Sequence, residues 1–181
     1  MVAPVKPRKV QMNGKQSFWL VPAVANPLVP KITEINHATG INLSCSVLKS
    51  FTGLTPTFNK VTLDGYLCET ESFEGNDNTS FSMSDIVGGF DPQAAQASDD
   101  KKAFEFLRTP FTGYAFFRNG VVADATSSEA TVGQFFNVIP VEIAAAVDTS
   151  DASTASNIAT FTAGVSVTGK PIFNVAAVAG P

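Results

Sequence analysis

Side chains able to do chemistry are few in this 181-residue sequence, which contains a single histidine, His37. A Ser-His-Asp triad, or a metal site built on two histidines, needs partners that one imidazole cannot provide unless Lys or carboxylates substitute for them. His37 precedes Ala38-Thr39-Gly40, a sequence that ends a helical turn. We therefore interpret His37 as a helix-end cap or a hydrogen-bonded surface residue, with a catalytic imidazole as the alternative.

Two further patterns could bind an ion or a nucleotide. Glu74, Asp77 and Asn78 bring oxygen ligands together, but their spacing does not fit an EF-hand and Asn-Asp-Asn is typical of a turn. Gly169-Lys170 lacks the glycine-rich loop that precedes the lysine of a P-loop. The sequence thus predicts no catalytic residue, no metal and no cofactor, and a protein that is not an enzyme.

The cysteines, Cys45 and Cys68, lie where apolar residues alternate. This position predicts two reduced core residues, as is usual in a protein made in the cytoplasm, and a disulfide between them is the alternative. The apolar run after the basic N-terminus is interrupted by Pro22 and Pro27, so we expect neither a signal peptide nor a membrane span.

Charge is divided unevenly along the chain. Residues 1–60 contain seven Lys/Arg and one Asp/Glu, whereas residues 61–181 contain five and fifteen. Opposite faces of two copies could therefore attract each other, or the division could be solvated surface only. The net charge of −4 argues against tight binding of nucleic acid. Only 15% of residues are charged, which suits strands that contact protein more than water.

Hydrophobic periodicity predicts an all-β fold, a sandwich or flattened barrel, with one short α-helix. We expect an N-terminal arm at residues 1–15 and one β-sandwich domain at residues 16–181, with a loop at about 47–57 and the helix at about 100–109. Asp99 or Asp100 would cap this helix, and Pro110 would end it. The strands are expected at 17–21, 41–45, 58–67 with an extension to 73, 79–83, 114–118, 121–125, 131–147, 158–168 and 171–178, with a helical turn at 31–36.

The connections follow from turn-forming residues. Gly75 to Asn78 and Asn119-Gly120 predict hairpin turns, and residues 84–100 predict a long connection. Residues 148–157 predict a polar hairpin tip. The pairs Phe116-Phe117 and Phe135-Phe136 place neighbouring rings on opposite faces of a strand, which requires apolar cover on both sides, from this chain or from a second subunit.

The order of these pieces over most of the chain resembles that of the major tail tube proteins of long, non-contractile-tailed (siphovirus-type) phages. The pieces are Phe18-Trp19-Leu20-Val21-Pro22, Ala25-Asn26-Pro27 with Pro30, Thr33-Glu34-Ile35-Asn36, Ile41-Asn42-Leu43-Ser44-Cys45, the hairpin at Arg118-Asn119-Gly120, Phe136-Asn137-Val138-Ile139-Pro140-Val141, Phe161 to Val167 and Pro171 to Val175.

The resemblance implies a virion structural protein, assembled in the host cytoplasm, whose copies form hexameric rings. Their inner sheets would join around a channel, and the rings would stack into a tube around a tape-measure protein that DNA later replaces. A tail terminator and distal tail proteins would be further partners. DNA would pass an acidic wall without specific binding, and no membrane would be involved.

The resemblance also implies that the N-terminal arm and the loop at about 47–57 bridge neighbouring rings. The interface candidates are Lys6, Arg8, Lys9, Leu48, Phe51 and Leu54. The alternative function is a β-sandwich binding module, such as a glycan adhesin or a capsid decoration protein. Such a module would carry exposed aromatic residues at its loop tips, which the expected tips at 75–78 and 148–157 lack.

Overall fold

The computed structural model describes residues 9–65, 68, 70, 71, 73–122, 129–153 and 158–180. These residues form eleven strands and two short helices, which confirms the all-β class. The elements are β1 (Gln16–Val21), α1 (Ile32–Ile35), β2 (Ile41–Asn42), β3 (Leu54–Leu63), β4 (Phe73–Met83), β5 (Ile86–Gly89), α2 (Lys102–Leu107), β6 (Phe111–Asn119), β7 (Phe135–Ile143), β8 (Val147–Asp148), β9 (Thr160–Ala163), β10 (Val165–Val167) and β11 (Ile172–Ala176). Among the described residues, no helix is long and apolar enough to cross a membrane.

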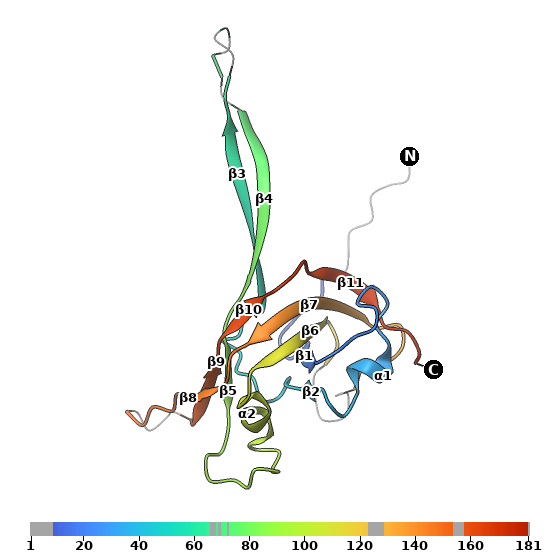
Figure 1. The fold of residues 1–181 in the computed structure, drawn as a ribbon, viewed down its shortest axis with the longest axis vertical. Coiled ribbons are helices and arrows are strands. Elements are labelled where there is room, and N and C mark those ends of the chain that lie inside the picture. Colours follow the sequence, from blue (N-terminus) through green and yellow to red (C-terminus); the bar gives the residue numbers. More distant parts are fainter. Residues whose placement is uncertain are drawn as a thin grey trace.

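The strands form three sheets (Figure 1). The largest has the order β10-β7-β6-β1-β2. β11 also pairs with β7, at Phe135 to Val138, whereas β10 pairs with it at Val141 to Ile143. A second sheet has the order β5-β9-β8, and the third is the two-stranded hairpin of β3 and β4. All of the strand pairings are antiparallel.

The largest sheet is buried on both faces because its strands carry apolar residues at successive positions. In β1, Phe18 and Leu20 enter one core cluster, while Trp19 and Val21 enter a second cluster on the other face. A strand alternates its side chains between two faces, so an uninterrupted apolar run needs cover on both.

The prediction that neighbouring rings of the Phe-Phe pairs lie on opposite faces is confirmed. Phe136 lies in the second cluster with Val138, and Ile139, Val141 and Ile143 lie in the first. Phe116 and Phe117 are buried in different clusters, whereas Phe135, the neighbour of Phe136, is exposed.

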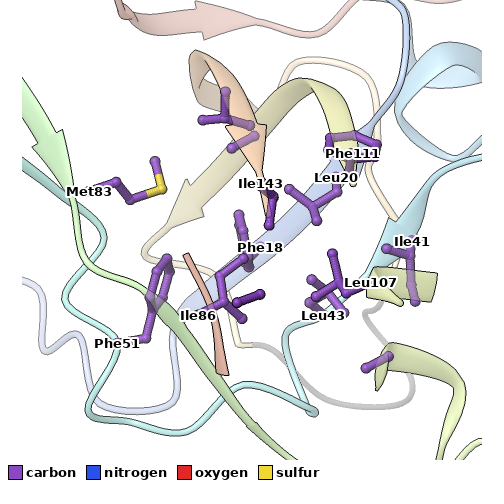
Figure 2. Packing of buried hydrophobic residues seen from close by; sticks show 14 of the residues in the cluster. Phe18, Leu20, Ile41, Leu43, Phe51, Met83, Ile86, Leu107, Phe111 and Ile143 are labelled. Atoms are coloured by element: carbon purple, nitrogen blue, oxygen red, sulfur yellow. The ribbon is translucent and has the colours of Figure 1, made fainter. Parts of the chain in front are cut away.

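The first cluster lies between the largest sheet and a cover made of the β5-β9-β8 sheet and α2 (Figure 2). Ala103 and Leu107 of α2 are buried in it, and Phe104 packs against it. The predicted cap is wrong, since Lys101 is the N-cap residue and makes no side-chain capping bond. Thus α2 is held by its apolar side rather than by its cap.

Two turn and loop predictions are wrong. Residues 75–78 lie inside β4 rather than in a turn, with Gly75 opposite Val61. Residues 86–89 form β5 inside the predicted long connection, where they pair with β9. In both cases, long-range pairing outweighs the local turn preference of Gly, Asn and Asp.

Three strand predictions also differ from the structure. The predicted strand at 41–45 is shorter, because β2 ends at Asn42, and the one at 158–168 is divided at Gly164 between two sheets. Residues 121 and 122 are not in a strand, and β6 pairs with β1 and β7 instead, while residues 123–125 lie outside the described residues. Cys45 and Cys68 are free but exposed, so their assignment to the core is wrong.

Gly88 allows β5 to pack closely against β9. A Cβ atom here would overlap the ring of Phe161 and would lie 2.8 Å from the carbonyl oxygen of Ser46. We expect Gly88→Ala to lower the free energy of unfolding by about 1–3 kcal/mol, the usual cost of overpacking a core. Gly89→Ala is the matched control, because its Cβ would make only ordinary van der Waals contacts, with Ile158 at 3.5 Å and the carbonyl oxygen of Ala159 at 3.9 Å. Urea unfolding of both variants tests this, and equal midpoints would contradict it.

Candidate assembly surfaces

The β3–β4 hairpin projects from the rest of the chain (Figure 1). Its root pairs Leu54 with Met83, and its outer end pairs Leu63 with Phe73. At about 3.3 Å per residue, these nine steps place the outer end roughly 30 Å from the root. The structure therefore begins a strand at Leu54, inside the range 47–57 where the sequence predicts a loop.

The apolar side chains of the hairpin change faces along its length. Near the root, Pro56 lies opposite Phe81 on one face. The register shifts between Phe58 and Lys60, and beyond this point Val61 and Leu63 lie on the other face, opposite Gly75 and Phe73. We call the second group, Val61, Leu63 and Phe73, the outer apolar face.

These side chains are open to solvent. Val61, Leu63 and Phe73 are 46%, 51% and 56% exposed, and Phe58 is 71% exposed. Lys60 and Glu74 form an ion pair of 2.8 Å on the face opposite the outer apolar face, but an exposed pair contributes little to stability. A two-stranded ribbon is only marginally stable in water, so cover from another molecule would stabilise this hairpin.

A groove of about 780 Å³ lies at the root of the hairpin. Phe58 and Phe81 line it from the hairpin, and Val167, Lys170 and Phe173 line it from β10, β11 and the segment between them. The rings of Phe81 and Phe173 are 6.2 Å apart, so the root already packs partly on the largest sheet. We call this the root groove.

A second depression, of about 590 Å³, is lined by parts of the two segments to which the family resemblance assigns the bridging of rings. Met12 and neighbouring residues of the N-terminal arm line one side, and Leu48, Lys49 and Phe51 line the other. We call it the arm–loop hollow. Phe51 itself is buried against the rings of Phe18 and Phe117, so it forms the floor.

Lys9 is exposed, and Leu54 packs partly against the core at the hairpin root. Lys6 and Arg8 lie outside the described residues. The assignment of all six candidates to an interface stays a prediction, as does the division into an N-terminal arm and one domain.

One buried cation, which the sequence analysis did not single out, fixes the sheet beside the second core. Arg118 of β6 is 1% exposed and donates to the side-chain oxygens of Ser17 (3.0 Å) and Gln134 (2.9 Å) and to the carbonyl oxygen of Glu129 (3.1 Å). Its guanidinium lies 5.0 Å from the ring centre of Trp19. Burial lowers the pKa of Arg118, but a guanidinium stays charged in proteins.

The residues first considered for chemistry take local structural roles. The His37 ring pairs with the hydroxyl of Thr39 at 2.8 Å, as a hydrogen-bonded residue beside a turn would. At the polar tip, hydrogen bonds from the hydroxyl and amide of Ser150 hold the pKa of Asp148 below its ordinary value. Within the described residues, no three His, Cys, Asp or Glu side chains gather as metal ligands would.

These surfaces suit a protein that binds other protein molecules, and sequence comparison decides which kind. A family model described as "Phage tail tube protein" matches residues 3–180. The chain belongs to this family. It is accordingly a structural component of the virion tail, and tail tube membership suggests a non-enzymatic role and assembly with other tail components.

No curated protein matches the sequence significantly. Among solved structures, the tail tube chain is similar to a chain of the cryo-EM structure of the anti-feeding prophage (AFP) baseplate, 6-fold symmetrised. The two are 7% identical, with a TM-score of 0.48, and the match covers 96% of this chain and 98% of the other.

Proposed function

We propose that six copies of this chain form a ring, and that the rings stack into the tail tube of a siphovirus-type phage, the conduit for DNA into the host. The projecting β3–β4 hairpin is the observation that carries the proposal. It exposes apolar side chains on a ribbon that the described part of its own chain leaves open, as a subunit built for self-association would.

The sheet edges support the same assembly. Among the described residues, no further strand pairs with the outer edges of β3 and β4 or with the edge formed by β10 and β11. Unpaired strand edges can pair with other chains and cause aggregation, and pairing them between the subunits of a closed ring removes this hazard. Assembly would take place in the host cytoplasm, with the tape-measure, terminator and distal tail proteins as partners. The net negative charge suits a conduit that DNA passes without specific binding.

Electron microscopy of the purified, overexpressed protein tests the proposal. We expect tubes or stacked rings, with sixfold symmetry in averaged end-on views. A protein that stays monomeric at high concentration, or that forms closed particles without a channel, would contradict it. In the phage, disabling the gene for this chain should leave filled heads without tails.

A further inference from the structure

We propose that the outer apolar face of the hairpin in one copy docks into the arm–loop hollow of a second copy. This contact rests on the proposed self-association, and it names the two surfaces that meet. The outer end of the hairpin points away from the body of its own chain, so it cannot fill the hollow of the same copy (Figure 1).

The inserted surface is narrow and apolar. Leu63 is paired with Phe73, and its side chain packs diagonally over Gly75, where a Cβ atom would lie 3.4 Å from Leu63 Cδ2. Val61, the partner of Gly75, and Phe73, the partner of Leu63, lie on the same face. The result is a ridge of three apolar side chains, each about half exposed, at the outer end of a hairpin roughly 30 Å long.

The receiving surface has matching chemistry. The arm–loop hollow offers Met12, Leu48 and Phe51 to an apolar ridge, and its volume of about 590 Å³ is large enough for several side chains. Met12 is exposed in the single chain, and Leu48 is half-buried, so both would lose contact with water on docking.

Charge complementarity supports the hollow as the receiving surface. On the outer half of the hairpin, Glu74 is paired with Lys60, which leaves the exposed carboxylates of Asp64, Glu71 and Asp77 without a matching cation in the outer half of the described hairpin. Lys49 lines the hollow, and the segments that supply its lining, residues 12–18 and 43–51, also contain Lys15 and no Asp or Glu. The root groove also has one lysine in its lining, Lys170, but Phe58 and Phe81 of the hairpin of the same copy already line it. Complementary charge steers the acidic outer half of the hairpin toward a basic lining.

The two surfaces are different parts of the same chain, so the contact is heterologous. Head-to-tail contacts of this kind generate closed rings or open helical stacks, whereas a self-complementary contact stops at a dimer. A ridge and a hollow on every copy therefore allow indefinite assembly, as a tube requires.

The two natural cysteines make the contact testable. Cys45 lines the hollow, and Cys68 lies between β3 and β4 at the outer end of the hairpin; both are free and exposed. We expect a short bis-maleimide to cross-link the wild-type chain into a ladder of dimers, trimers and longer species. Cys45→Ser and Cys68→Ser, each alone, should give no Cys45–Cys68 link. Their equal mixture should give a dimer and nothing longer.

Lys49→Glu reverses the charge in the lining of the hollow at an exposed position and should slow cross-linking about tenfold, the effect of about 1.4 kcal/mol. Lys170→Glu, in the root groove, is the matched control and should leave the rate unchanged. Raising the salt concentration should slow the wild-type reaction, because exposed charges are screened.

Three results would overturn the docking. The first is a mixture of Cys45→Ser and Cys68→Ser that cross-links no faster than either variant alone. The second is cross-linking of Cys45→Ser to itself through Cys68 of two copies, which indicates contact between two hairpin tips. The third is a rate that responds to Lys170→Glu and not to Lys49→Glu. Tubes that form without the Cys45–Cys68 link would contradict the docking contact but support the proposed function. The link in an assembly that is not a sixfold tube would support the docking contact but contradict the proposed function.

Discussion

Replacing Arg118 with alanine is expected to lower the free energy of unfolding by about 3–5 kcal/mol. The change leaves three buried or partly buried oxygen acceptors without their donor, and hydrogen bonds to charged groups each contribute about 1.5–3 kcal/mol. It also removes the cation from the face of Trp19. Domains of this size have a total stability of only about 5–15 kcal/mol. Thermal unfolding should therefore occur roughly 10 °C lower.

Arg108→Ala is the matched control for this variant. Arg108 pairs with Glu105 at 2.9 Å on the surface of α2, and its side chain is exposed, so its loss should cost less than about 0.5 kcal/mol. Arg118→Lys should recover only part of the loss, because one ammonium cannot reproduce the fork that reaches Ser17, Gln134 and Glu129 together. Equal unfolding temperatures for Arg118→Ala and Arg108→Ala would show that the buried cluster does not stabilise the fold.

The sequence was informative where burial itself sets the pattern. In β1 and β7, apolar residues at successive positions predict a sheet with two covered faces, and Trp19 and Phe136 do meet in the second core at a ring distance of 5.7 Å. The helical turn at α1 was also predictable, because Pro30 precedes it and Ile32 and Ile35 are three residues apart. Such signals are local, so they survive without knowledge of the strand partners.

The sequence analysis missed the full length of the hairpin, because residues 75–78 form a strand only when they pair with β3. Gly75 to Asn78 predict a turn on their own, yet in β4 Gly75 and Asn76 lie opposite Val61 and Lys60, and Asp77 and Asn78 lie where the register shifts. A β-bulge accommodates such residues inside a strand. The threonines of β3 are a β-forming signal that could have indicated a longer strand. Likewise, Arg118 follows Phe116 by two positions, the spacing that puts both side chains on one buried face.

Neutral polar substitutions on the outer apolar face should separate folding from assembly. The double variant Leu63→Asn/Phe73→Asn removes two apolar side chains that are about half exposed in the single copy, so its unfolding temperature should stay within about 2 °C of wild type. Central apolar anchors carry most of the energy of an interface, each contributing about 2 kcal/mol or more. Losing two should raise the concentration needed for assembly by roughly 10³-fold. Sedimentation velocity should then show a folded monomer where wild type forms tubes.

Thr62→Asn distinguishes the face from the strand. Thr62 lies between Val61 and Leu63 but points to the other side of the ribbon, opposite Glu74. The substitution adds the same amide to the same segment of β3, so a general loss of strand structure would affect both variants alike. Tubes from Thr62→Asn at the wild-type concentration, together with monomers from the double variant, would assign the effect to the outer apolar face. Normal tubes from both variants would mean that this face is not a point of contact between copies, and that the cover the hairpin needs comes from a different tail component.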